Sequence, residues 1–252
     1  MSNAKTCILM WYDDACKEWG DINYEINKAY CEKHGYDLIR DSERRIPSRM
    51  PHFERIALIR EYLPQYDHVI WIDADAYFYI DSPPIQHVID TYNEFDFILS
   101  EDICHRDWRI APDHINTGIF CVKNTPYSMR ILDLWGYDKN LYNSFFNDGN
   151  VNRQNHGWNH GFSEQEVLKK LFHEDIHDLK KHALVLPFGF LQIFSEDDRL
   201  HLTDHALEAL SFNDMEKSYI FHHAGQDISE PEKTHPRTKG SSDYYNLYIK
   251  KK

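Results

Sequence analysis

The stretch Val69-Ile70-Trp71-Ile72-Asp73-Ala74-Asp75-Ala76 joins a run of large apolar residues to two aspartates that are one residue apart. A short apolar run of this kind is typical of a buried strand. Aspartates that follow such a strand lie at the carboxyl edge of a parallel sheet, where open α/β sheets bind their ligands. A bend in the chain at this point lets both carboxylates reach one hard cation. We therefore interpret Asp73 and Asp75 as metal ligands, and the alternative is two surface aspartates at the start of a loop.

Strands and helices alternate on the N-terminal side of this stretch. Gly35 and Pro64 mark the ends of two segments whose apolar residues recur at helical spacing. The predicted strands cover residues 6–12, 36–39 and 68–72, and the predicted helices cover about 22–34 and 53–63. This alternation predicts a parallel sheet with right-handed crossovers, and therefore an α/β fold with a Rossmann-like central sheet. The length of 252 residues suits a single domain.

The pattern is less regular after residue 76. Further strands are predicted over 95–100, 118–123, 184–188 and 219–221, and further helices over 83–92, 126–135 and 163–172. Seven asparagines between residues 139 and 161 indicate a long irregular loop, which we interpret as part of an acceptor side because long loops are often functional. Residues 231–252 are polar and are expected to form a solvated tail.

Composition argues against several classes of function. The 28 basic and 41 acidic residues give a net charge of −13, which argues against nucleic acid as a partner. No apolar run reaches the roughly 20 residues of a membrane span. The five cysteines show no CxxC pair, as expected of reduced thiols in the cytoplasm. Because Met1-Ser2-Asn3-Ala4 resembles a cloning remnant, the alternative is a Golgi-lumenal domain whose N-terminal anchor was removed.

A second polar group follows a short apolar run near the C-terminus, in Tyr219-Ile220-Phe221-His222-His223-Ala224-Gly225. A histidine at the end of a strand can offer an imidazole nitrogen to the same cation as the two aspartates. A mixed nitrogen and oxygen ligand set favours Mn²⁺ over Mg²⁺. A histidine in such a position is more often structural, and the pairing with Asp73 and Asp75 is what makes His222 a candidate metal ligand.

Four motifs, taken in order, resemble glycosyltransferase family 34, a group of GT-A-fold nucleotide-sugar transferases with galactosyl-, mannosyl- and xylosyltransferase members. They are the segment 27–36 (NKAYCEKHGY), the segment 53–76 from Phe53-Glu54-Arg55-Ile56 to Ala76, the strand Asn116-Thr117-Gly118-Ile119-Phe120 with Trp135 after it, and Glu164-Gln165 followed by His222 and Gly225. They span about residues 23 to 226. The resemblance implies a GT-A fold, which is a mixed but mainly parallel central sheet flanked by helices.

The resemblance also implies which residues carry the chemistry. Asp73, Asp75 and His222 would bind Mn²⁺, or Mg²⁺ as the alternative, and the ion would neutralise charge on the departing nucleotide diphosphate. Glu164, Gln165 and Asn116 are the implied catalytic residues, beside the transferred sugar and its cationic transition state. The other residues implied to bind the nucleotide-sugar donor are Trp11, Tyr12 and Asp13 at the base, and Arg55, Ala74, Gly118 and Gly225 at the phosphates and sugar.

The implied reaction moves a hexose such as galactose, or xylose, from a nucleotide-diphosphate donor to a hydroxyl of a glycan or glycoside. A UDP-linked donor is favoured, and the family transfers its sugar with retention at the anomeric carbon. Residues 1–125 would then form the half that holds the donor and the metal, and residues 126–230 the acceptor half.

The chain departs from the family after Gly225. Gln226-Asp227-Ile228 stand where the family has a cysteine and then a lysine, so Lys233 or Arg237 becomes the candidate contact to the diphosphate. Glu164 replaces the aspartate of the family's DQ motif. Three alternatives stay open, namely a glycogenin-like GT-A transferase, a phosphohydrolase of the haloacid dehalogenase type, and a non-catalytic carbohydrate-binding fold.

Overall fold

The computed structural model describes residues 5–102, 115–141, 163–194, 218–223 and 236–250. Its main sheet has six strands in the order β2-β1-β3-β6-β5-β7. β6 runs antiparallel to both of its neighbours, and every other pair is parallel. These strands are β1 (Thr6–Trp11), β2 (Asp37–Asp41), β3 (His68–Ile72), β5 (Phe97–Glu101), β6 (Ile115–Lys123) and β7 (Ala183–Leu186). The predicted α/β class with a mainly parallel sheet is confirmed.

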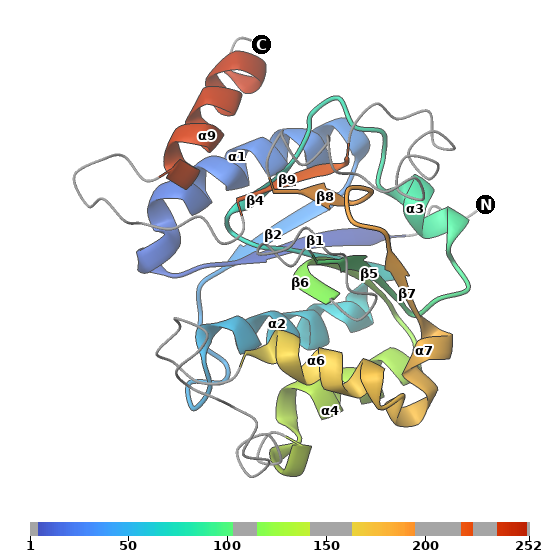
Figure 1. Cartoon of the computed structure of the whole chain (residues 1–252). Helices are drawn as coiled ribbons and strands as arrows, with labels where there is room; N and C mark the ends of the chain where they lie inside the picture. Colours follow the sequence, from blue (N-terminus) through green and yellow to red (C-terminus); the bar gives the residue numbers. More distant parts are fainter. Residues whose placement is uncertain (1–4, 103–114, 142–162, 195–217, 224–235, 251–252) are drawn as a thin grey trace.

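Helices cover both faces of the main sheet (Figure 1). On one face lie α1 (Lys17–His34) and α3 (Gln86–Thr91), and on the other lie α2 (Glu54–Tyr62), α4 (Pro126–Tyr137), α6 (Glu164–His173) and the short α7 (Leu179–His182). A small second sheet lies on the α1 side, in the order β4 (Ala76–Phe78), β9 (Ile220–His222) and β8 (Gln192–Ile193). Short 3₁₀ turns occupy Asp14–Cys16, Pro51–Phe53, Leu63–Gln65 and Ile176–Asp178.

The central strands β1 and β3 are largely apolar, and both of their faces are buried. Along β1, Leu9 and Trp11 join the core cluster on the α2 side, whereas Ile8 and Met10 join the cluster on the α1 side. This alternation follows from the two-residue period of a strand. β3 is buried over its whole length in the same way and ends directly before Asp73, so the core places this aspartate at the carboxyl edge of the sheet.

Several elements differ from the sequence prediction. β6 begins at Ile115, three residues earlier than predicted, so Asn116 and Thr117 lie within a strand. β8 has only two residues, too few for an apolar period to be recognised. Most of the asparagine-rich loop, residues 142–161, lies outside the described part of the chain.

The segment that the sequence marks as a solvated tail contains a helix, α9 (Pro236–Tyr244), followed by a π-helical turn over Tyr245–Ile249. α9 contacts α1. Tyr244 anchors it, because this side chain is buried and its hydroxyl accepts a hydrogen bond from the backbone N–H of Ile80 at 2.7 Å. A single buried aromatic residue among polar neighbours does not produce apolar residues that recur at helical spacing. This explains why the sequence did not predict α9.

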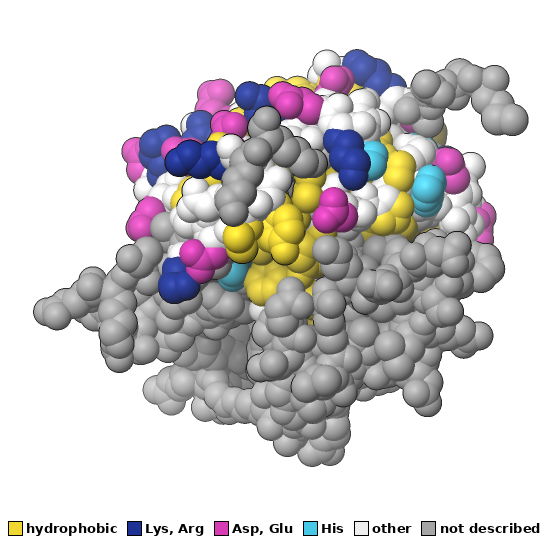
Figure 2. Space-filling view, turned by 90° about the horizontal axis from the view of Figure 1, so that it is seen from above, with side chains coloured by type: hydrophobic (Ala, Val, Ile, Leu, Met, Phe, Trp, Pro, Cys, Tyr) yellow, Lys and Arg dark blue, Asp and Glu magenta, His cyan; other side chains and the backbone are white. Residues whose placement is uncertain are grey.

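The surface seen from above, on the side of α1 and α9, carries lysine and arginine side chains interspersed with aspartate and glutamate (Figure 2). The described residues on this face therefore form no continuous basic surface of the kind that nucleic acids require. None of the described helices is long and apolar enough to cross a bilayer.

Three of the cysteines are buried thiols, and we expect native folding to protect them from alkylation. Burial raises the pKa of Cys121 to about 12, and burial together with the charge of Asp37 raises that of Cys7 to about 12. Burial raises the pKa of Cys31 as well. A thiol with a pKa of about 12 is ionised to only about one part in 10⁴ near pH 8, and the thiolate is the reactive form. Mass spectrometry after iodoacetamide treatment should therefore find these three sites modified in denaturant and unmodified without it. Rapid native labelling of Cys121 would contradict this packing.

Candidate active site

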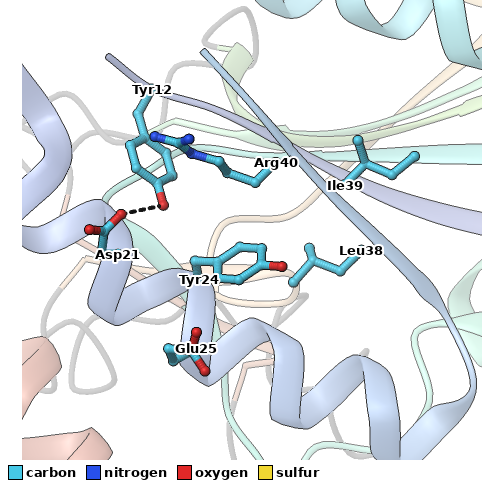
Figure 3. Close-up of a pocket in the computed structure, with 7 residues that line it drawn as sticks. All are labelled: Tyr12, Asp21, Tyr24, Glu25, Leu38, Ile39 and Arg40. Carbon is cyan, nitrogen blue, oxygen red and sulfur yellow. Dashed lines mark hydrogen bonds between the residues drawn. The ribbon is translucent and has the colours of Figure 1, made fainter. Parts of the chain in front are cut away.

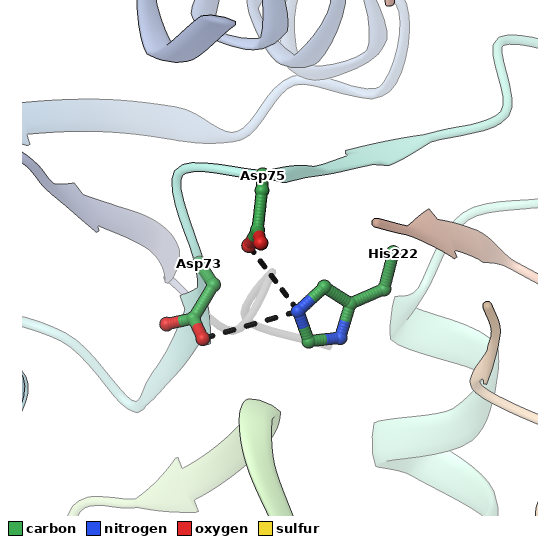
Figure 4. Close-up of side chains that lie close together, drawn as sticks. All are labelled: Asp73, Asp75 and His222. Carbon is green, nitrogen blue, oxygen red and sulfur yellow. Dashed lines mark ion pairs between the residues drawn. The ribbon is translucent and has the colours of Figure 1, made fainter. Parts of the chain in front are cut away.

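The structure brings the two polar groups of the sequence together. Asp75 Oδ1 lies 3.2 Å from Nε2 of His222, and Asp73 Oδ2 lies 3.9 Å from the same nitrogen (Figure 4). One donor atom from each of the three residues lies within 4.8 Å of the others. The register of the small sheet explains this meeting, because His222 in β9 is paired with Ala76 in β4. Two carboxylate oxygens and one imidazole nitrogen fit a divalent cation such as Mn²⁺.

The turn that carries Asp73 and Asp75 is held by two asparagines of α1. Asn23 donates a hydrogen bond from Nδ2 to the carbonyl of Ala74 at 2.8 Å. Asn27 donates to the carbonyl of Ala76 at 3.1 Å and accepts from the N–H of Phe78 at 2.9 Å. Both asparagines are buried. Their four-residue spacing places them on one face of the helix, which is the signal that could have singled them out in the sequence.

The two oxygens of Asp73 have different surroundings. Oδ1 accepts a hydrogen bond from Trp71 Nε1 at 2.7 Å and lies 3.1 Å from Nη2 of Arg55. Oδ2 accepts a hydrogen bond from the same Nη2 at 3.4 Å and is the oxygen nearer to His222. The side chain of Arg55 is 9% exposed, and its Nη1 forms a second ion pair with Glu164 Oε1 at 3.1 Å. Arg55 therefore helps to fix the orientation of the Asp73 carboxylate.

Electrostatics favour the binding of a cation between the carboxylates. Burial raises the pKa of Asp73, against the opposing charge of Arg55, and the neighbouring Asp75 adds to the rise. Burial alone would lower the pKa of His222, but the charges of Asp75 and Asp73 outweigh it, and the net shift is upward. The rise at His222 reflects the negative charge of the two aspartates, whereas the rise at Asp73 comes mainly from burial. A divalent ion would place positive charge beside these groups and would compete with protons for the same electron pairs.

Polar groups at the start of β6 lie beside the candidate metal ligands. Asn116 Oδ1 accepts from the N–H of Gly118 at 2.8 Å, and Gln165 Oε1 accepts from the N–H of Thr117 at 2.9 Å. Asp102 lies within 3.5 Å of both side-chain amides. Our sequence analysis missed Asp102, although it follows the strand β5 directly, just as Asp73 follows β3.

Gly118 provides space for the imidazole of His222. A Cβ atom at this position would lie 2.3 Å from Cε1 and 3.0 Å from Nδ1 of His222. The glycine therefore permits the close approach of strand β6 to His222. This contact differs from the sugar contact that the resemblance implies for Gly118.

Glu164 is the first residue of α6 and contacts Thr117 of β6 and Arg55 of α2. The cap of α6 is as predicted, since Ser163 accepts from the N–H of Glu166. Glu164 itself is 2% exposed, and its carboxylate accepts from the hydroxyl of Thr117 at 2.7 Å in addition to the ion pair with Arg55. Arg55 and Thr117 therefore hold the carboxylate of Glu164, one of the implied catalytic residues.

The side chains of the three residues expected to bind the nucleoside base, Trp11, Tyr12 and Asp13, point in different directions. The indole of Trp11 donates to the carbonyl of Glu43 at 2.9 Å on the α2 side. Tyr12 is buried on the α1 side, where its hydroxyl donates to Asp21 at 3.0 Å and Arg40 lies 4.3 Å from its ring. Asp13 is half-buried and accepts from the N–H of Ala15 at 3.0 Å.

Tyr12 borders a surface hollow between α1 and β2 with a volume of about 630 Å³ (Figure 3). The hollow is lined by Tyr12, Asp21, Tyr24, Glu25, Leu38, Ile39 and Arg40.

The remaining residues expected at the donor lie near the C-terminus. Gly225 and Lys233 lie outside the described residues, and Arg237 belongs to α9.

Comparison with solved structures identifies the fold. The chain is similar to a glycosyltransferase involved in glycosylation of the major capsid of PBCV-1, with a TM-score of 0.61 and 16% identity over 94% of this chain and 99% of that one. It is also similar to the galactosyltransferase LgtC in complex with donor and acceptor sugar analogs, with a TM-score of 0.57 and 10% identity over 95% of each chain. These neighbours confirm the GT-A fold.

Comparison with sequences gives relatives that are also named as glycosyltransferases. A stretch of 198 residues is 25% identical to the "Probable alpha-1,6-mannosyltransferase MNN10" of Saccharomyces cerevisiae, covering 67% of this chain. The match covers 46% of the yeast protein, so the chain spans less than half of that relative's length. A family profile described as "Protein of unknown function, DUF273" matches residues 27–172, which is more than half of the chain. The chain therefore belongs to the DUF273 family.

Proposed function

We propose that this protein is a metal-dependent glycosyltransferase that moves a sugar from a nucleotide diphosphate to a hydroxyl of a glycan or glycoside. The observation that carries the proposal is the convergence of Asp73, Asp75 and His222 at the carboxyl edge of the sheet, in a fold shared with a galactosyltransferase. The names of the sequence relatives support the same class of reaction.

The chain's own residues have separate roles in this proposal. Asp73, Asp75 and His222 would hold Mn²⁺, which when bound acts as a Lewis acid toward the diphosphate. Arg55 keeps Asp73 in place. Asp102, Asn116 and Gln165 form a polar group beside the ligands that can hydrogen-bond to the hydroxyls of the donor sugar.

The transfer breaks the bond between the anomeric carbon and the phosphate oxygen, and it forms a bond from that carbon to the acceptor oxygen. The bonding pair leaves with the nucleoside diphosphate, and the acceptor hydroxyl gives up its proton to an oxygen of that leaving group. We propose a UDP-linked hexose or xylose as the donor and retention at the anomeric carbon, as the resemblance to family 34 implies.

A thermal-shift panel tests the proposal. The protein is heated with UDP, GDP, ADP or CMP, each with and without Mn²⁺. A ligand that binds only the native state raises the melting temperature by mass action, by an amount equivalent to about 2.7 kcal/mol at a concentration of 100 Kd. We expect UDP to raise the melting temperature when Mn²⁺ is present and to have little effect without it. If none of the four nucleotides shifts the transition in the presence of Mn²⁺, the proposed donor site is wrong.

A further inference from the structure

The amide of Gln192 is buried against the imidazole of His222. Gln192 lies in β8 and is 0% exposed, and its Oε1 is 2.8 Å from Nδ1 of His222. Within the described part of the chain, its Nε2 has no hydrogen-bond partner. Burying a primary amide is costly unless its polar atoms are hydrogen-bonded. An apolar side chain would therefore suit this position better, unless the contact to His222 serves a purpose.

The surroundings of His222 leave its two ring nitrogens with different partners. Nε2 is directed toward Asp73 and Asp75, and the other nitrogen is directed away from them (Figure 4). Gly118 lies against Cε1, and the ring of Phe194 meets the imidazole edge to face at 5.5 Å. The residue His222 is 3% exposed, so its imidazole ring has little freedom to rotate.

This arrangement links the position of one proton to the binding of the metal. A neutral imidazole carries a proton on one nitrogen only. The tautomer with the proton on Nδ1 leaves the electron pair of Nε2 available to a metal, and this tautomer needs an acceptor at Nδ1, which Oε1 of Gln192 provides. The competing tautomer carries the proton on Nε2, where it can donate to Asp75 Oδ1 at 3.2 Å. That proton occupies the electron pair that the metal requires.

We propose that Gln192 is a positioning residue that holds His222 in the tautomer with Nε2 open to the metal. The inference rests on the proposed metal site and adds a residue outside its ligand set. Groups that hydrogen-bond to a metal-binding histidine orient it, and their removal typically weakens metal affinity 10–100-fold. A neutral amide performs this task without adding a third negative charge beside Asp73 and Asp75.

The test compares Mn²⁺ binding by the full chain and its variants, with free Mn²⁺ measured by electron paramagnetic resonance. Gln192→Met keeps the length of the side chain and removes the acceptor, so the affinity for Mn²⁺ should fall about 10–100-fold. Gln192→Glu keeps an acceptor oxygen at Nδ1 of His222, although it adds a negative charge, and it should bind Mn²⁺ more tightly than Gln192→Met does. Gln86→Met is the matched control, because it also removes an amide with a hydrogen bond, here to Thr6 at 3.0 Å, and it should leave the affinity unchanged.

A second measurement reads the tautomer directly. The nitrogen chemical shifts of ¹⁵N-labelled histidine distinguish the two tautomers at a pH where the ring is neutral, and the His222 signals are identified by their loss in His222→Gln. We expect the Nδ1–H form in the metal-free wild type and the Nε2–H form in Gln192→Met. The Nε2–H form in wild type would overturn the inference, and so would wild-type affinity in Gln192→Met. A wild-type protein that binds no Mn²⁺ would instead refute the metal site itself.

Discussion

Asp75→Asn is expected to abolish glycosyl transfer while leaving the fold intact. Asp75 contributes a carboxylate oxygen 3.2 Å from Nε2 of His222, and its side chain is 13% exposed. Its backbone makes a further contact, in which the carbonyl accepts from the N–H of His223 at 2.9 Å. Asparagine keeps this backbone contact and the shape of the side chain, and it removes the charge that would face the metal.

The size of the loss follows from what the charge does. A bound metal stabilises the leaving diphosphate by several kcal/mol, and about 4 kcal/mol corresponds to about 10³-fold in rate. We expect kcat/KM for sugar transfer to fall by at least this factor, and the free energy of unfolding to change by less than about 1 kcal/mol, as for a substitution that leaves packing unchanged. Steady-state kinetics and urea unfolding measure the two quantities.

Asp133→Asn provides the matched control for Asp75→Asn. Asp133 forms an ion pair with Arg60 at 2.5 Å between two side chains that are about half exposed, and it lies on α4, outside the candidate site. Exposed pairs of this kind contribute about 0–1 kcal/mol, so activity should be unchanged. Full turnover by Asp75→Asn would show that this carboxylate does not bind an essential metal.

The sequence predicted Asp73, Asp75 and His222 as candidate ligands because each lies at or just beyond the end of a short apolar strand. A run of buried residues that ends in a polar one is visible without knowledge of the fold, as at Ile72 and Asp73. The pairing of Ala76 with His222 could not be predicted from the sequence. Both strands have only three residues, which is too short for an alternation of apolar and polar residues to be recognised. The resemblance to family 34 connected the two signals.

Other parts of the site depend on side-chain partners that local patterns do not encode. The ion pair of Arg55 with Glu164 joins α2 to α6 on one face of the sheet (Figure 1), and the apolar pattern of neither helix indicates it. Gln192 belongs to a strand of two residues. The opposite orientations of Trp11 and Tyr12 were predictable in part, because adjacent residues of an extended chain point to opposite faces.

Gly118→Ala is expected to destroy the metal site by displacing His222. The new methyl group would lie 2.3 Å from Cε1 of the imidazole and 3.0 Å from Oδ1 of Asn116. The imidazole cannot retreat easily, since Gln192 and Phe194 contact it on other sides. Gly118 cannot retreat either, because its carbonyl accepts from the N–H of Asp73 at 2.9 Å and its N–H donates to Asn116. The clash must therefore be relieved by a displacement of the His222 imidazole, the ring that carries the proposed metal-binding nitrogen.

We expect the affinity of Gly118→Ala for Mn²⁺ to fall by about 100-fold or more, because changes even one shell away from a metal cost 10–100-fold. Overpacking should also lower the free energy of unfolding by about 1–3 kcal/mol. Gly136→Ala separates these two effects. Its Cβ would lie 2.7 Å from Cγ2 of Ile56 in the core between α4 and α2, so it should cost similar stability and leave Mn²⁺ binding unchanged. If both variants lose stability and both bind Mn²⁺ with wild-type affinity, His222 tolerates displacement and does not serve as an essential ligand.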